Sequence, residues 1–437
     1  CKVEGEDISC RRCERHSRKG QSKRIALCWR KQYWRGVNMR DVILCGNGGL
    51  LQYVKKDVSR DGYRIIHETI EDIADGDGKC LETSEIFLTV SWHETDAWIQ
   101  RLKEAGTGTI YRIPVFAMQY KLPIIQNGEL IPGTYAKVSS DSSNLLYLET
   151  HVADTCNLKC RGCMHFSNIA IHPNYPDLQK FEQDFKRLSE LFRNIFIIRL
   201  MGGEPLLNPE LGSYIKIARQ YFPAAELRIV TNGLLIPRQP DNLWEVMRSC
   251  HAAMDISPYP PTMEKIEELT KKLDKEGIPY GTIAEKLQNF RKSLTLSPHH
   301  NPEKATRLCG SAHCHFLRNG RIAKCPLPLL IGDFNHEYGC TIESKDIYDI
   351  YSEQSGDALK EKLEQYADMC RYCPDEAAFI PWQRTQQDAC LQFTGHIQEF
   401  CTFRCQFSCI FPCGQYTGHN VCQLPVKTIR CRHLIKA

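Results

Sequence analysis

The sequence predicts an α/β protein in three parts: a short, open β/α barrel in the middle, a smaller β-α-β domain before it and a cysteine-rich region after it. Apolar runs of strand length alternate with amphipathic helical stretches through residues 40–300, which is the pattern of parallel β-α-β units. Glycine-containing turns follow several of these runs. The chain has 437 residues, which is enough for two or three domains.

Composition and charge exclude several classes of protein. Hydrophobic residues make up 42% of the chain and charged residues 25%, which is ordinary for a soluble globular protein. The formal net charge of +4 is too small for this length to indicate a nucleic-acid or membrane-surface partner. No run of 18 apolar residues predicts a membrane span, and the basic N-terminus lacks the apolar core of a signal peptide.

The cysteine content is unusual. The 23 cysteines occur in clusters along a long chain, whereas disulfide-rich secreted scaffolds are mostly short. This distribution favours metal binding, and we therefore expect the protein to be cytoplasmic, where thiols stay reduced.

Both ends of the chain are expected to lie outside the fold. Residues 1–38 are a basic extension crowded with Arg and Lys, and a strand follows directly after Met39. We interpret Met39 as the natural start and the extension as non-native; the alternative is a basic, disordered arm. Residues 383–437 carry seven cysteines, and beyond Asp388 their only acidic residue is Glu399. We interpret this tail as translated out of frame; the alternative is a metal-binding tail.

Residues 39–143 are expected to form a small Rossmann-like domain and a linker. The expected elements are a strand over 42–45, a helix to about 58, a strand over 85–90, a helix over 96–105 and a strand over 109–113. The dinucleotide fingerprint is broken, because Leu51 occupies its last glycine position. We therefore expect a docking or substrate-presenting module rather than a nucleotide site. Residues 121–143 are rich in Pro, Gly and Ser and are interpreted as the linker.

Residues 144–304 are expected to form the barrel. The expected strands are 144–152, 195–200, 227–231, 252–257 and a fifth at 278–283, with helices over 178–192 and 262–276. So few repeats predict a partial barrel, and ligands should gather at the carboxyl ends of its strands.

A cysteine triplet follows the first strand of this barrel. Cys156, Cys160 and Cys163 have the spacing C-x3-C-x2-C on one short loop. Three thiolates can hold three irons of a [4Fe–4S] cluster and leave the fourth iron open to a substrate or cofactor. The alternative is a structural zinc site with His165 as its fourth ligand.

This loop, followed by Gly202-Gly203-Glu204-Pro205 at the end of the next strand, resembles the radical SAM superfamily. Many members have an aromatic residue where this chain has Gly162, although a subset shares the glycine. The resemblance implies that S-adenosylmethionine (SAM) binds the open iron. The candidate SAM-binding residues are Gly202, Gly203, Glu204, Pro205, Thr231, Asn232 and Ser257, and two further candidates for the pocket are His165 and Tyr259.

The resemblance also implies the reaction. One electron from the cluster would cleave a carbon–sulfur bond of SAM, and the resulting 5′-deoxyadenosyl radical would take a hydrogen atom from a substrate. The cofactors supply this chemistry and the protein positions them. A reductant such as flavodoxin or ferredoxin is then required.

Residues 305–382 carry a second set of cysteines around a hairpin expected at Asn319-Gly320. They resemble the auxiliary-cluster domains, SPASM or the shorter twitch type, of radical SAM enzymes. That resemblance predicts one auxiliary [4Fe–4S] cluster held by four of the five residues Cys309, Cys314, Cys325, Cys370 and Cys373, with Cys314 as the rival to the other four. A structural zinc is the alternative, and Cys340 is expected to be a plain thiol.

The substrate is the least determined part of the prediction. A similar Rossmann-like domain ahead of a radical SAM core suggests a sugar or other small molecule of a surface polysaccharide pathway. The alternatives are a peptide- or protein-modifying maturase of the SPASM type, and a non-catalytic metal-binding or electron-transfer protein.

Overall fold

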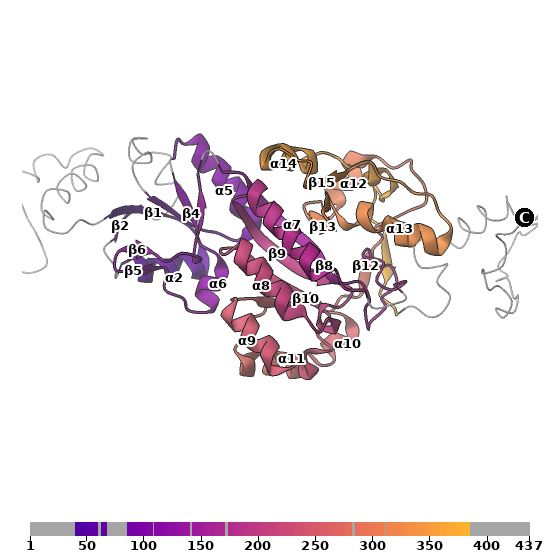
Figure 1. The fold of residues 1–437 in the computed structure, drawn as a ribbon, viewed down its shortest axis with the longest axis horizontal. Helices are drawn as coiled ribbons and strands as arrows, with labels where there is room; N and C mark the ends of the chain where they lie inside the picture. Colours follow the sequence, from indigo (N-terminus) through magenta and orange to yellow (C-terminus); the bar gives the residue numbers. More distant parts are fainter. Residues whose placement is uncertain are drawn as a thin grey trace, which may run out of the picture.

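The structure is a computed structural model that describes residues 40–59, 63–67, 85–107, 109–139, 142–170, 174–281, 285–310 and 312–384. The prediction made for residues 1–38 falls outside the described residues, and so does the prediction for residues 383–437 apart from Gln383 and Arg384. Two main sheets organise the rest, with the N-terminal sheet at one end of the molecule and the cysteine-rich elements at the other (Figure 1). No helix in the described part of the chain is long and apolar enough to cross a membrane.

The N-terminal sheet has five strands in the order β2-β1-β3-β4-β7. Four strands run parallel and β7 is antiparallel to its neighbour. The strands are β1 (Arg40–Gly46), β2 (Tyr63–His67), β3 (Glu85–Thr89), β4 (Ile110–Arg112) and β7 (Ala136–Val138). The helices are α2 (Gly48–Val58), α5 (Trp92–Glu104) and α6 (Val115–Gln119).

Both faces of this sheet are covered. In β1, Ile43 and Cys45 pack into one apolar cluster, while Val42 and Leu44 pack into another. Because successive side chains of a strand point to opposite faces, β1 is buried on both sides, as in parallel sheets covered by helices. The expected Rossmann-like arrangement of strands and helices is therefore present in outline.

Two features of this region differ from the prediction. Strand β2 was not expected, and residues 121–139 are not a plain linker. They form the hairpin of β5 (Ile125–Gln126) and β6 (Glu129–Leu130) and then strand β7 of the sheet. The Pro and Gly residues that suggested a linker mark the turns between these short strands.

The central sheet has seven strands in the order β11-β10-β9-β8-β13-β14-β15. The first five run parallel, which makes the expected partial barrel, and β14 and β15 are antiparallel additions at one edge. The strands are β8 (Asn144–Ala153), β9 (Asn194–Gly202), β10 (Glu226–Thr231), β11 (Ala253–Ile256), β13 (Phe316–Arg318), β14 (Arg321–Ala323) and β15 (Ile347–Asp349).

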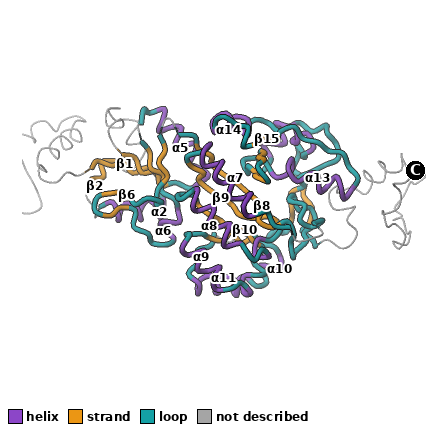
Figure 2. Tube along the Cα trace, viewed as in Figure 1, coloured by secondary structure: helices purple, strands orange, loops and turns teal. Residues whose placement is uncertain are grey.

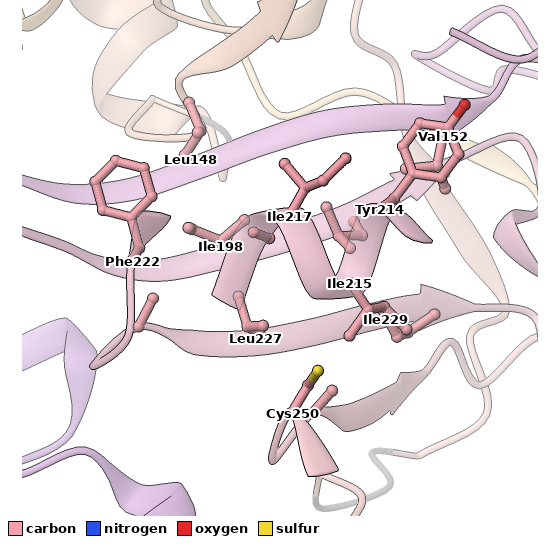
Figure 3. Close-up of a cluster of buried hydrophobic side chains, with 14 of the residues drawn as sticks. Leu148, Val152, Ile198, Tyr214, Ile215, Ile217, Phe222, Leu227, Ile229 and Cys250 are labelled. Carbon is pink, nitrogen blue, oxygen red and sulfur yellow. The ribbon is translucent and has the colours of Figure 1, made fainter. Parts of the chain in front are cut away.

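Helices cover one face of the parallel strands, with α7 and α8 lying over β8, β9 and β10 (Figures 1 and 2). In α7, Phe181, Phe185 and Leu188 follow the i, i+4, i+7 spacing of a helix face and are buried. Figure 3 shows the same core around Ile198 and Tyr214. The helices are α7 (Leu178–Leu191), α8 (Leu211–Tyr221), α9 (Asp241–Ser249), α10 (Pro260–Met263) and α11 (Ile266–Glu276), with short 3-10 turns η2 (Pro205–Leu207) and η3 (Ile236–Arg238).

Of the predicted fifth strand, the described residues 278–281 form only one bridge to the sheet. Tyr280 makes a single parallel bridge to Met254 of β11, and residues 282–284 fall outside the described part. Pro279 precedes that bridge and has no N–H with which to extend a ladder. The predicted helix over 262–276 is divided into α10 and α11.

The cysteine-rich region extends the barrel sheet instead of forming a separate layer. Strand β13 pairs in parallel with β8, so that Phe316 lies opposite Glu149. The predicted hairpin joins β13 to β14, and both Asn319 (φ 49°) and Gly320 (φ 77°) have the positive φ that a tight hairpin turn requires. Its other elements are α12 (Pro302–Leu308), α13 (Pro326–Tyr338), α14 (Gly356–Glu364), η4 (Asp368–Tyr372), and the paired strands β12 (Asn289–Arg291) and β16 (Phe379–Pro381).

The N-terminal sheet is joined to the barrel by buried contacts. Phe196 and Ala224 of the barrel pack into the apolar cluster of the N-terminal sheet. Arg112 on β4 forms an ion pair with Glu226 on β10, and both side chains are almost fully buried.

Candidate active site

A cavity of about 370 Å³ lies where the parallel strands of the barrel end. Both cysteine sets line it. Cys156, Cys160 and Cys163 come from the loop after β8, and the second set comes from the cysteine-rich region: Cys309, Cys325, Cys370 and Cys373. The volume is at the low end of the range of small-molecule sites.

The cysteine loop is shaped by residues with positive φ. Lys159, Gly162 and Phe166 have φ values of 48°, 73° and 52°. A Cβ atom on Gly162 would lie 2.3 Å from Cδ1 of Ile380, which β16 brings against the loop. Gly162, which stands where an aromatic residue is common, is therefore required by its positive φ and by its packing against Ile380.

The three cysteines of this loop are shielded from solvent to different degrees: Cys160 is buried, whereas Cys156 and Cys163 are half-buried. Burial raises the pKa of Cys156 to about 11 and that of Cys160 to about 12, and it raises the pKa of Cys163 as well. Donors partly offset burial: the backbone N–H of Leu158 lies 3.4 Å from Cys156 Sγ, and Asn232 Nδ2 lies 3.7 Å from the same sulfur. These thiols will therefore become thiolates mainly when a metal group binds them, because ligation removes the proton.

The two cysteine sets offer donors that fit an iron–sulfur cluster. Thiolates are the ligands that such clusters take, and both sets line one cavity. Thiolates also bind zinc, so the donors by themselves fit either group.

Gly202 and Gly203 hold the end of β9 against the cysteine loop. A Cβ on Gly202 would lie 1.9 Å from Ala153 O, and one on Gly203 would lie 2.0 Å from Thr155 O. The backbone N–H of Gly203 donates to Ala153 O at 2.8 Å. The glycines therefore permit a close approach of two chain segments, and both also line the cavity.

The side chain of Glu204 does not reach the cavity. It is fully buried, and its carboxylate accepts hydrogen bonds from Thr231 Oγ1 (2.6 Å), Asn232 N (2.8 Å) and Leu206 N (3.0 Å). Burial raises the pKa of Glu204 to about 7, although these three donors oppose the shift. Glu204 thus fixes the turn after β10. Of the predicted SAM-binding residues, Glu204 and Pro205 are the two that do not line the cavity.

The other residues expected to contact SAM do reach the cavity, namely Thr231, Asn232, Ser257 and the pocket candidates His165 and Tyr259. Ser257 N donates to Thr231 O at 2.9 Å, so the ends of β10 and β11 are joined. Asn232 Nδ2 also donates to Asn157 Oδ1 at 2.7 Å, which connects β10 to the cysteine loop.

A pair of histidines forms a network that the sequence analysis missed. His165 Nδ1 lies 2.9 Å from His151 Nε2, and His151 Nδ1 lies 2.8 Å from Asp154 Oδ1. Arg318 pairs with both oxygens of Asp154, at 2.6 and 2.9 Å. Burial lowers the pKa of both histidines, although Asp154 opposes the shift at His151, and this favours the neutral form of each imidazole. The spacing of His151 and Asp154, three residues apart at a strand end, was a visible signal.

The network determines the tautomers. Because Asp154 accepts the proton of His151 Nδ1, His151 Nε2 accepts a hydrogen bond from His165 Nδ1–H. The remaining nitrogen of His165, Nε2, therefore carries a lone pair, and this ring lines the cavity.

Cys314 is separated from the other four cysteines of its region. It hydrogen-bonds Glu149 on β8 and does not line the cavity, whereas Cys309, Cys325, Cys370 and Cys373 do. Cys314 lies two residues before Phe316, which pairs with Glu149 of β8, so the β13–β8 pairing brings Cys314 to that strand. Cys340 also lies outside the cavity, with its sulfur 3.9 Å from Tyr338 O.

Comparison with known proteins agrees with this geometry. Residues 150–283 match the family model described as the radical SAM superfamily. The chain is 34% identical over 98 residues to a GTP 3′,8-cyclase of a Sulfurovum species, covering 22% of this chain and 30% of that protein. It is 30% identical over 127 residues to a GTP 3′,8-cyclase of Microcystis aeruginosa, covering 28% and 37%.

These matches are partial, since the chain spans about a third of the length of the curated relatives. Among solved structures, BtrN in complex with AdoMet and 2-DOIA is similar over 55% of this chain and 98% of that one, with 16% identity and a TM-score of 0.33. A similarity of that size supports no conclusion about substrate.

Proposed function

We propose that this chain is an iron–sulfur enzyme of the radical SAM type that oxidises a small anionic substrate, because residues 150–283 match the radical SAM family model. The main observation behind the proposal is that the three-cysteine set and the four-cysteine set line the same cavity. A substrate in that cavity would lie between two iron–sulfur clusters.

Cys156, Cys160 and Cys163 would hold the cluster with one open iron. That cluster, when bound, supplies the electron that cleaves SAM to the 5′-deoxyadenosyl radical. The backbone of Gly202 and Gly203 would orient SAM together with Thr231, Asn232 and Ser257, all of which line the cavity. Glu204 contributes by holding the Thr231–Asn232 turn in place.

Cys309, Cys325, Cys370 and Cys373 would hold the auxiliary cluster. Four thiolates leave no open iron, so this cluster suits electron transfer better than substrate ligation. The substrate would lose a hydrogen atom from carbon to the 5′-deoxyadenosyl radical, an electron to this second centre and its hydroxyl proton to a base such as His165 Nε2 or water, which leaves a carbonyl group. The lone pair on His165 Nε2 is available to accept a hydrogen bond from a substrate hydroxyl, which would hold the reacting carbon in place.

The charge of the cavity supports an anionic substrate. Arg291, Lys292 and Lys324 line it, and no carboxylate does so among the described residues. Lys324 donates to the carbonyls of Leu363 (3.0 Å) and Glu364 (3.1 Å), so its ammonium is held beside the four-cysteine set. Arg291 lies at the end of β12 and is placed to meet a phosphate or carboxylate.

The size of the cavity supports a small molecule. A volume of about 370 Å³ is at the low end of the range for small-molecule sites, which favours a small substrate over a peptide chain. We therefore propose a sugar or a similar hydroxyl compound bearing a phosphate or carboxylate, and a flavodoxin- or ferredoxin-type reductant.

Anaerobic reconstitution tests the proposal. The full chain should bind about eight irons and eight sulfides, and it should release 5′-deoxyadenosine from SAM with dithionite. Cys160→Ala should abolish that release, whereas Cys340→Ala should leave it unchanged. Zinc binding without release of 5′-deoxyadenosine would refute the proposal and favour a non-catalytic metal protein.

A further inference from the structure

We propose that Trp382 tunes the reduction potential of the SAM-binding cluster by donating an indole hydrogen bond to its ligand Cys160. Trp382 Nε1 lies 3.2 Å from Cys160 Sγ, and Cys160 is almost fully buried. This inference rests on the proposed function, because it requires a cluster on the three-cysteine loop.

Trp382 is brought to the cysteine loop by a strand from the other end of the site. It directly follows β16, which pairs with β12, and its own N–H donates to Gln288 O at 2.9 Å. The next two residues run alongside the cysteine loop. Arg161 N donates to Gln383 O at 2.8 Å, and the backbones of Arg384 and Cys160 form an antiparallel β-bridge. The backbone thus fixes the register that aims the indole at one sulfur.

The indole ring is also held by its neighbours. It stacks on Tyr259, with ring centroids 6.2 Å apart and an angle of 24° between the planes. Tyr259 in turn meets Phe290 of β12 edge to face, at 5.8 Å. Indole N–H is a donor only, so in this position it can only give a hydrogen bond to the sulfur.

A donor on a ligand sulfur favours the more negative form of that ligand. Reduction of an iron–sulfur cluster adds negative charge that is shared with its sulfurs, and hydrogen bonds to those sulfurs are among the factors that set the potential. The N–H of Trp382 should therefore stabilise the reduced cluster and make the electron transfer that starts SAM cleavage easier.

The position of Trp382 in the chain links the two cysteine sets. It lies nine residues after Cys373, and the intervening strand β16 runs from the second set to the first. A chain that folds its four-cysteine set correctly therefore also delivers the donor to the three-cysteine loop.

The test is the midpoint potential of the SAM-binding cluster in Trp382→Phe, measured by redox titration with EPR detection on the reconstituted full chain. Addition of SAM identifies the signal of this cluster, because only this cluster binds SAM. Phenylalanine keeps an aromatic ring against Tyr259 and removes the donor. The ratio of reduced to oxidised cluster at a fixed potential should fall by about two- to twelvefold. This range is the change in an equilibrium constant that the loss of one hydrogen bond of typical net strength produces. A tenfold fall corresponds to about 59 mV for a one-electron couple.

Trp98→Phe is the matched control, since Trp98 lies on α5 in the N-terminal domain and should leave the potential unchanged. If Trp382→Phe fails to assemble clusters, the unaltered chain labelled with indole-¹⁵N tryptophan decides the question. A ¹⁵N coupling to the reduced SAM-binding cluster is expected, and its absence would overturn the inference. A normal cluster with an unchanged potential in Trp382→Phe would overturn the inference alone, whereas no cluster on the three-cysteine loop of the unaltered chain would overturn the proposed function itself.

Discussion

The ion pair between Arg112 and Glu226 should be the strongest polar connection between the N-terminal sheet and the barrel. Its side chains are 0% and 3% exposed. Arg112 Nη1 has no hydrogen-bond partner among the described residues, so the guanidinium depends on the Glu226 carboxylate for compensation. Glu226→Gln should therefore lower the free energy of unfolding by about 3–5 kcal/mol, the usual cost of leaving a buried charge without its partner.

Two further variants separate the cost of an unpaired buried charge from the net contribution of the ion pair to the free energy of unfolding. Arg112→Met/Glu226→Met removes both charges, and its stability should lie close to that of the unaltered chain, because Arg228, the second partner of Glu226, keeps its ion pair with Asp255. Glu267→Gln is the surface control. Glu267 faces Lys271 at 4.0 Å with both side chains at least 80% exposed, so its loss should cost no more than about 0.5 kcal/mol.

The pH dependence follows from the same pair. Burial by itself would raise the pKa of Glu226, but the guanidiniums of Arg112 and Arg228 outweigh it and hold the pKa below its usual value. The stabilisation is then present above the unfolded-state pKa of about 4.5 and is lost as the pH falls through the lower folded-state value. The difference between the unaltered chain and Glu226→Gln should shrink accordingly in acid.

Urea denaturation of the full chain, followed by circular dichroism at pH 7 and at pH 4, measures these differences. A loss below about 1 kcal/mol in Glu226→Gln at pH 7 would refute the reasoning. A double variant as unstable as the single one would refute it as well.

Three further predictions concern the site. Gly203→Ala should prevent normal cluster assembly, because the added Cβ would lie 2.0 Å from Thr155 O. Iron analysis after reconstitution measures this, and a normal iron content would contradict the prediction. Cys325→Ser should lower the iron content from about eight to about four per chain, whereas Cys314→Ser should leave it unchanged; the reverse result would assign the ligands differently. Asn232→Ala should weaken SAM binding about tenfold, because the Asn232 side chain lines the cavity and hydrogen-bonds Asn157 of the cysteine loop. Equilibrium dialysis measures the dissociation constant, and an unchanged constant would contradict the prediction.

Much of the site could be predicted from short stretches of sequence. The spacing of Cys156, Cys160 and Cys163 lies within eight residues, and the glycine pair directly follows the next strand. Helix α7 was predicted within one residue at its end, because its apolar side chains repeat at the period of a helix. Such features depend on neighbours along the chain, and so they are visible without a structure.

Contacts between distant segments were not predicted. The hydrogen bond from Trp382 to Cys160 spans 222 residues, and the pairing of β13 with β8 joins residues more than 160 apart. The hydrogen bonds of the Glu204 carboxylate were not predicted either, because Thr231 and Asn232 lie 27 and 28 residues away along the chain.

The sequence by itself determined the type of chemistry, since three thiols on one loop and a glycine pair after a strand are local patterns. Only the tertiary structure decided which four cysteines line the cavity, which donors the Glu204 carboxylate accepts from, and that Trp382 hydrogen-bonds the cysteine loop. The physical reason is that strand register and burial result from many weak contacts summed over the whole chain, and no short segment contains that sum.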